Sequence, residues 1–187
     1  MAHSVTFDLR VLGLIGSPGA GGFTSQVVDA VLAGSRSAGA SAFAYELCDG
    51  DQDGAAAQVQ RADAIVFGSP TYRASHTALV ASLLERLERR TPPERGGPLA
   101  GKAAAIVMTG ASDCHFLATE KLRTTLSCFF AVQVLAPSLY VGQTNRQTDR
   151  ALDEASRITA ALHGKALVEL SRAVRAGSAL QSLAPIV

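Results

Sequence analysis

The sequence predicts an α/β fold: one doubly wound domain whose five-stranded parallel sheet carries helices on both faces. Three observations predict it. Short apolar runs alternate with helical segments, each run is apolar almost throughout, and the first and third runs end in glycine-bearing turns. Strands that are buried on both faces lose the alternation of polar and apolar residues, as these runs do. At 187 residues the chain has the size of one domain, with residues 1–9 and 176–187 as tails.

The first half of the chain supplies three strands and two helices. The run at 11–15 leads into a glycine-dense turn, and the valines and leucines of 27–32 recur at helical spacing before Gly34. An alanine-rich stretch then separates two further runs, of which the second ends in glycine, serine and proline. The predicted elements are strands at 11–15, 42–47 and 64–67 and helices around 27–32 and at 55–62.

The second half predicts two more strands and three helices. The helices are expected at 77–89, 116–130 and 148–175, and the strands at 103–108 and 134–141, with a loop at 91–101. Pro137 cannot donate a backbone hydrogen bond, which marks its strand as an edge of the sheet. The helix at 77–89 carries an apolar stripe that is wider than one sheet face needs. The stripe consists of Leu79, Val80, Leu83, Leu84 and Leu87.

Charge and composition exclude several classes of protein. The formal net charge is +1, so no general field attracts nucleic acid or anionic lipid. Residues 1–10 lack the apolar stretch of a signal peptide, and no run is long enough to span a bilayer, so we expect a cytoplasmic protein without a membrane partner. The three cysteines are an odd number without a CxxC spacing, which argues against a disulfide framework and a structural zinc site.

Ligands of doubly wound folds bind at the carboxyl ends of the strands, which directs attention to the loops after the first, third and fourth strands. The first loop, residues 16–25, joins a strand to a helix, where unpaired N–H groups and the helix dipole favour a phosphate. This loop is not a P-loop, because Gly22 and Phe23 stand where that motif needs lysine and a hydroxyl residue.

Two other interpretations of the first loop remain open on its residues alone. Gly13, Gly16 and Gly19 are spaced three apart, and Glu46 ends the second strand as a candidate ribose ligand, as in a Rossmann dinucleotide turn. The loop can also be a glycine-rich turn without a ligand. The second loop, residues 68–75, favours neither, since a segment leading into an apolar helix here has no role in the Rossmann scheme.

Three segments of the chain resemble the NADPH-dependent FMN reductase family. They are Pro70-Thr71-Tyr72 with Ser75 three residues after the tyrosine, Thr109-Gly110-Ala111-Ser112 after the fourth strand, and Leu99-Ala100-Gly101-Lys102 before it. The resemblance covers about residues 11–141. It implies a flavodoxin-like fold with strand order 2-1-3-4-5, FMN and NAD(P)H as cofactors, and flavin reduction as the activity. It also implies a homodimer or homotetramer that assembles through the helix at 77–89, and a partner monooxygenase that receives reduced flavin.

The resemblance further implies FMN-binding residues in all three loops. Ser17, Gly22, Thr24 and Ser25 would lie at the phosphate, Pro70, Thr71, Tyr72 and Arg73 along the isoalloxazine, and Thr109, Gly110, Ala111 and Ser112 at its pyrimidine edge. Hydride transfer between nicotinamide and flavin needs no side-chain acid or base, so we name no catalytic residue and no metal ligand. Family members usually carry arginine and then serine where this chain has Gly19 and Gly22, which predicts weaker FMN binding. His76 and His115 fit a site lining and an ordinary surface position equally well.

The same residues leave two alternative functions open. A non-catalytic flavodoxin-like module or electron carrier with a weakened flavin site is the first, and a Rossmann-type NAD(P)-binding protein is the second. Electron-carrying flavodoxins usually present a charged docking face, whereas this chain is nearly neutral. The charge therefore favours an NAD(P)H-dependent FMN reductase.

Overall fold

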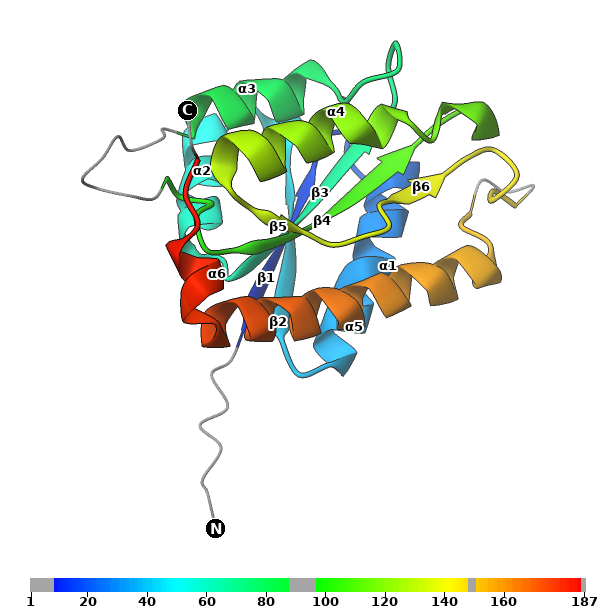
Figure 1. Ribbon diagram of the computed structural model, residues 1–187. Helices are drawn as coiled ribbons and strands as arrows, with labels where there is room; N and C mark the ends of the chain where they lie inside the picture. The colour runs from blue at the N-terminus through cyan, green and yellow to red at the C-terminus, as the bar shows by residue number, and fades with distance from the viewer. Residues whose placement is uncertain (1–8, 88–96, 148–150, 186–187) are drawn as a thin grey trace.

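A parallel sheet lies between two layers of helices in the computed structural model, which describes residues 9–87, 97–147 and 151–185 (Figure 1). The strands are β1 (Arg10–Ile15), β2 (Ser41–Glu46), β3 (Ala64–Pro70), β4 (Ala103–Thr109), β5 (Gln133–Val134) and β6 (Leu139–Val141). They follow the order β2-β1-β3-β4-β5, and β6 also pairs with β4. The predicted fold class and strand order are confirmed. The Rossmann interpretation is wrong, because the dinucleotide fold has the order 3-2-1-4-5-6.

The helices divide between the two faces of the sheet. α1 (Phe23–Ser37) and α5 (Glu154–Ala176) cover one face, and α2 (Gln52–Arg61), α3 (Ala78–Arg86) and α4 (Ala118–Thr124) cover the other (Figure 1). Alternate residues of β1 supply the two cores, with Val11 and Ile15 toward α1 and α5, and Leu12 and Leu14 toward the other layer. The shorter elements are 3₁₀ turns at Leu47–Asp49 and Asp113–His115, a π-helical turn at Thr125–Phe129, and α6 (Ser178–Ser182).

The fifth strand differs from the prediction. A single strand was expected at 134–141, but the structure has two short pieces, β5 and β6, that both pair with β4. Pro137 lies in the interruption, where it has no N–H for the ladder. Other boundaries shift as well: the helix expected at 116–130 divides at Thr125, and α6 forms where a tail was expected. Residues 1–8, 88–96 and 148–150, which carry parts of the predicted N-terminal tail, helices and loop, lie outside the described residues.

The apolar stripe of α3 packs within the chain. Thr77 caps the helix, and Val80, Leu83, Leu84 and Leu87 are buried with residues of β1, β3 and β4. Leu79 is partly buried against the same cluster. The sheet and its neighbours absorb this stripe, so the stripe itself does not require a second chain. The packing of α3 therefore gives no support to the expectation that this face is buried between chains.

Helices α1 and α5 approach each other more closely than side chains normally allow. A Cβ atom at Gly34 of α1 would overlap the carbonyl of Ala161, and one at Gly164 of α5 would overlap the carbonyl of Val31. The Ser35 hydroxyl donates across the same interface to the Gly164 carbonyl at 3.2 Å. Two glycines that face each other in this way fix the position of α1, whose first turn belongs to the candidate site.

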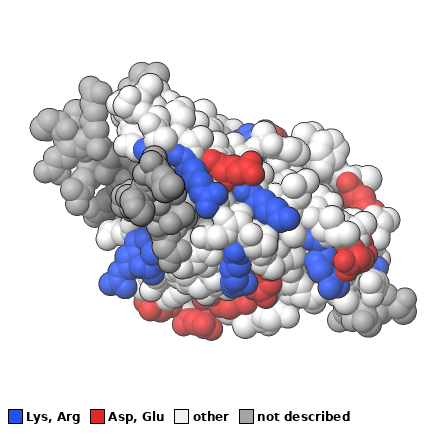
Figure 2. All heavy atoms as spheres, turned by 90° about the horizontal axis from the view of Figure 1, so that it is seen from below, with Lys and Arg blue, Asp and Glu red and all other residues white. Residues whose placement is uncertain are grey.

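The surface carries both signs of charge side by side on the face that Figure 2 shows. This mixture agrees with a formal net charge of +1. Across the described ranges, no helix has both the length and the apolar character needed to cross a bilayer.

Candidate functional site

The carboxyl ends of β1, β3 and β4 meet at one edge of the sheet, and the three loops singled out from the sequence leave from them. In the strand register Ile15 lies opposite Gly68, and Pro70 lies opposite Thr109. The Thr71 N–H donates to the Thr109 carbonyl at 2.6 Å, which ties the second loop to the third. The structure thus brings together all the predicted site segments, although long stretches of sequence separate them.

The first loop begins at a glycine that is held from two sides. The Gly16 N–H donates to the Gly68 carbonyl at 2.8 Å, and the Gly16 carbonyl accepts from the Thr77 hydroxyl at 2.7 Å. A Cβ at Gly16 would overlap the Val80 side chain, so only glycine fits this turn. Gly22 then precedes α1 without a side-chain cap, and the first turn of α1 contains no acidic residue. The helix N-terminus therefore keeps the partial positive charge that attracts an anion.

Buried hydroxyls join the first loop to the third. The Thr24 and Thr109 hydroxyl oxygens lie 2.7 Å apart, and both residues are buried. Ser17 and Ser25 are also buried beside the loop backbone. The Thr24 and Thr109 hydroxyls are partners of each other, and the Ser25 hydroxyl donates to Glu46, so these groups form a hydrogen-bonded polar cluster beside the strand ends.

The second loop ends in a tight turn with an unusual backbone. Tyr72 and Ser75 exchange both backbone hydrogen bonds, at 2.9 and 3.0 Å, around Arg73 and Ala74. These two central residues have φ angles of 50° and 55°, in the left-handed region that non-glycine residues rarely adopt. Tyr72 is 55% exposed at the tip of this turn. Strained backbone in a loop beside a strand end is typical of ligand-binding segments.

The third loop is fastened to β6. The Gly110 N–H donates to the Val141 carbonyl at 3.0 Å, and the Tyr140 hydroxyl donates to the Ser112 carbonyl at 2.6 Å. Burial raises the pKa of Tyr140, with nearby Asp113 adding to the effect, so the phenol stays protonated as a donor. A Cβ at Gly110 would overlap the Tyr140 hydroxyl, so a larger residue here would force the Tyr140 side chain to move.

Sequence reasoning missed or misplaced several residues at this edge. Glu46, weighed as a ribose ligand, instead accepts hydrogen bonds from the Ser25 hydroxyl and the Gly21 N–H. Arg146 lies over the ring of Phe23, the first residue of α1, with 4.1 Å between its guanidinium carbon and the ring centroid. No motif signals these contacts, because each joins residues that are distant in the sequence. The left-handed turn after Tyr72 also lacks the glycine or asparagine that usually announces one.

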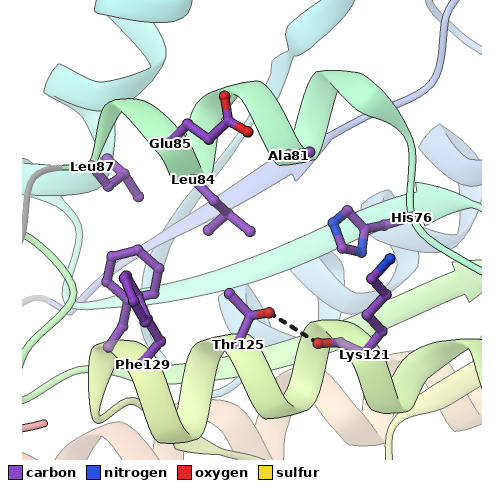
Figure 3. Close-up of a pocket in the computed structure, with 9 residues that line it drawn as sticks. His76, Ala81, Leu84, Glu85, Leu87, Lys121, Thr125 and Phe129 are labelled. Atoms are coloured by element: carbon purple, nitrogen blue, oxygen red, sulfur yellow. Dashed lines mark hydrogen bonds between the residues drawn. The ribbon is translucent and has the colours of Figure 1, made fainter. Parts of the chain in front are cut away.

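His76 and His115 lie outside the cluster of loop hydroxyls. His115 is exposed, whereas His76 is half-buried and lines a cavity of about 530 Å³ between α3 and the helical segment from Ala118 to Phe129. Figure 3 shows His76 close to Lys121 at one end of this groove and Phe129 at the other. Burial, and then the charge of Lys121, lower the pKa of His76. The groove is mostly apolar and lies beside the sheet rather than at the strand ends.

The arrangement offers binding groups in place of a reactive side chain. Hydroxyls, backbone N–H groups and one exposed aromatic ring converge on the strand ends, and the helix N-terminus supplies an anion-binding charge. Among the described residues, no three histidine, cysteine, aspartate or glutamate side chains lie together as a metal site would require. Such an edge suits an elongated ligand with a phosphate at one end and a planar group at the other.

Comparison with known proteins identifies similar flavin reductases and a similar flavodoxin. The NADH-dependent FMN reductase SfnF from Pseudomonas putida is 30% identical over 82 residues, which are 44% of this chain and 40% of that protein. An apo NADH:FMN oxidoreductase, EmoB, has a TM-score of 0.71 at 20% identity, and the match covers 94% of this chain and 95% of that one. A flavodoxin from the domain Archaea has a TM-score of 0.62 at 16% identity over 88% of this chain and 99% of that one. The two structural matches show that the fold is shared.

The family model of the NADPH-dependent FMN reductases matches residues 9–146. The match contains the three loops, the strands from which they leave and the turn after β6 that carries Arg146. The resemblance noted in the sequence is thereby confirmed, and it implies FMN and a nicotinamide nucleotide as cofactors. The chain belongs to the NADPH-dependent FMN reductase family.

Proposed function

We propose that this protein is an NAD(P)H-dependent FMN reductase. The observation that carries the proposal is the convergence of three loops at one sheet edge, which the 2.7 Å contact between the Thr24 and Thr109 hydroxyls holds together. Family membership supports the same activity. The curated relative is an NADH-dependent FMN reductase, and the aligned segment spans 40% of its length.

The open loop before α1 fits a flavin phosphate. A Cβ at Gly19 or Gly21 would meet nothing within 4 Å, and one at Gly22 would lie 3.8 Å from the nearest atom, the Gly19 carbonyl oxygen. The space in front of the uncapped start of α1 is thus left open by these glycines, although the Glu46 carboxylate borders it. A phosphate fits such a space because it needs close approach to backbone donors.

In this proposal each of the three loops contacts a different part of FMN. Ser17, Gly22, Thr24 and Ser25 would hold the phosphate, Pro70, Thr71, Tyr72 and Arg73 would lie along the isoalloxazine, and Thr109, Gly110, Ala111 and Ser112 would lie at its pyrimidine edge. This assignment is supported by the position of the three loops at the carboxyl ends of β1, β3 and β4. Tyr72 supports the assignment further, since a flat ring at 55% exposure offers a surface on which another ring can stack.

Hydride transfer from a nicotinamide to FMN is the chemistry that the two cofactors supply when bound. The protein binds the two cofactors and orients them. The bond from Tyr140 to the Ser112 carbonyl fixes the course of the third loop, so its backbone donors are preorganised. The paired backbone bonds of Tyr72 and Ser75 hold the second loop in one conformation. No side chain at this edge needs to exchange a proton during the reaction.

Assembly and partners follow as further parts of the proposal. Phe116 and Leu117, just before α4, are 57% and 66% exposed, and Phe129, at the end of the π-helical turn, is 44% exposed. Exposed apolar side chains of this size support a homodimer or homotetramer. We expect light scattering at micromolar concentration to report more than one chain, and a monomer would contradict this. The choice between NADH and NADPH, a monooxygenase that receives reduced flavin and a cytoplasmic location stay proposals from the sequence.

A turnover assay tests the central proposal. Purified protein should oxidise NADH or NADPH at a rate that rises with added FMN, and titration should give a bound-flavin spectrum. The electron carrier remains the second candidate, because the fold is shared with an archaeal flavodoxin. Bound FMN without any NAD(P)H oxidation would select the carrier. Neither binding nor turnover at saturating FMN would reject both functions.

A further inference from the structure

Glu46 places a carboxylate on the donors of the loop proposed to hold the flavin phosphate. It is the last residue of β2, and one of its oxygens, Oε1, accepts from the Ser25 hydroxyl at 2.9 Å and from the Gly21 N–H at 3.3 Å. Both donors belong to the segment around the start of α1. The protein thus holds an anion of its own at the place where a phosphate would be bound.

The contacts of Glu46 suit a carboxylate that a bound phosphate can displace. Its second oxygen, Oε2, is buried without a hydrogen-bond partner among the described residues. A carboxylate that only stabilises the fold would have both oxygens satisfied, since a buried unpaired oxygen costs free energy. The loop above is open, because a Cβ atom added at Gly19 or Gly21 would have no neighbour within 4 Å. The carboxylate therefore has room to leave when another anion arrives.

A phosphate that enters this loop has to face two costs. It either displaces Glu46 from the Ser25 hydroxyl and the Gly21 N–H or does without these two donors. If Glu46 leaves, its two hydrogen bonds are lost; if it stays, two like-charged groups lie close in a partly buried place, where Coulomb repulsion is stronger than in water. A flavin without a phosphate, such as riboflavin, faces neither cost. Arg146 lies over the Phe23 ring, and its guanidinium leaves the two donors to Glu46.

We propose that Glu46 is a specificity-determining residue that reduces the preference of this site for FMN over riboflavin. The site accordingly takes FMN as a substrate that exchanges, and it takes riboflavin with comparable affinity. This inference rests on the proposed function, because it concerns the flavin site of the reductase.

Flavin titrations of matched variants test the inference. The dissociation constants of FMN and riboflavin are measured by fluorescence for the wild type, Glu46→Gln, Glu46→Ala and Asp29→Asn. Asp29 is an exposed carboxylate further along α1, so its change alters net charge equally without touching the loop. Glu46→Gln keeps the shape of the side chain, and Glu46→Ala covers the case in which the amide disturbs folding. We expect Glu46→Gln to bind FMN about 10-fold more tightly, with riboflavin affinity unchanged.

The outcomes separate this inference from the proposed function. An FMN-to-riboflavin affinity ratio that rises in the Glu46 variants and not in Asp29→Asn supports the role of Glu46. An unchanged ratio in a wild type that binds both flavins and oxidises NAD(P)H overturns this inference alone. Weaker binding of both flavins overturns it as well, since Glu46 would then be a flavin ligand. Absence of flavin binding in the wild type and every variant overturns the proposed function and the inference together.

Discussion

Substituting Gly19 by arginine tests whether the first loop binds a phosphate. Family members usually carry arginine here, and the structure shows that the chain can accept it. The backbone of Gly19 lies outside the left-handed region, and a Cβ there would meet no atom within 4 Å. Gly19→Arg should therefore fold without strain.

The expected gain follows from the bonds that an arginine makes. Hydrogen bonds between charged groups contribute about 1.5–3 kcal/mol, which corresponds to roughly 10- to 150-fold tighter FMN binding. Glu46 accepts from the Gly21 N–H two residues away, so a new guanidinium would share part of its charge with that carboxylate. We therefore expect the lower part of the range, about 10-fold.

Two variants serve as controls for this measurement. Gly19→Ala adds a Cβ without a charge, and it separates the loss of backbone freedom from the charge effect. Gly21→Arg adds the same charge nearby, but at a φ of 67°, where a side chain costs about 1–2 kcal/mol of stability. Isothermal titration with FMN and thermal melts compare all three. Equal FMN affinity in Gly19→Arg and Gly19→Ala would show that no phosphate lies near this position.

Three further changes probe other parts of the site and its surroundings. Tyr72→Ala should weaken FMN binding about 5-fold or more while melting within about 2 °C of the wild type, because the ring is 55% exposed; unchanged affinity and turnover would remove it from the site. Gly110→Ala should lower the free energy of unfolding by about 2 kcal/mol in urea titrations, since its Cβ overlaps the Tyr140 hydroxyl, and adding Tyr140→Phe should restore part of the loss. The lowered pKa of His76 means that the unfolded chain takes up a proton first on acidification, so stability should fall as pH drops below about 6.5. His76→Gln should lose this dependence in melts at several pH values between about 7.5 and 5.5, and an identical profile would contradict the argument.

The order of the elements and the meeting of the three loops at one sheet edge could be predicted from the sequence, because both depend on local patterns. The apolar runs at 11–15, 64–67 and 103–108 are strands in the structure, with ends that differ by a few residues. Parallel strands bring their carboxyl ends to one edge, so the loops that follow them had to be neighbours. Pro137 correctly marked the edge of the sheet. The extent of pairing on each side of Pro137 depends on which backbone groups of β4 lie within hydrogen-bonding reach, and the local sequence does not show this.

The contacts that shape the site could not be predicted, because they join distant residues or break local rules. The bond of Ser25 to Glu46 joins the start of α1 to the end of β2, and nothing in either segment announces it. Arg73 and Ala74 adopt positive φ angles without glycine, so the turn at Tyr72 has no sequence signal. The apolar stripe on α3 could be predicted from its spacing. Its burial within the chain could not, because the residues that cover it come from several strands.

The facing glycines of α1 and α5 restrict the movement of the helix behind the loop that we propose to hold the phosphate. Because Gly34 and Gly164 leave no space for even one added methyl group, α1 cannot move closer to α5 without forcing two backbones into each other. The exposed residues before the helix have no such restraint, so we expect the loop to adjust to a ligand more readily than the helix does. Gly164 and Ala161 also lie beyond residue 146, where the family match ends. The part of the chain that packs against α1 thus lies outside the matched residues, and a protein trimmed to residues 9–146 would retain the three loops while losing the packing of α5 on α1.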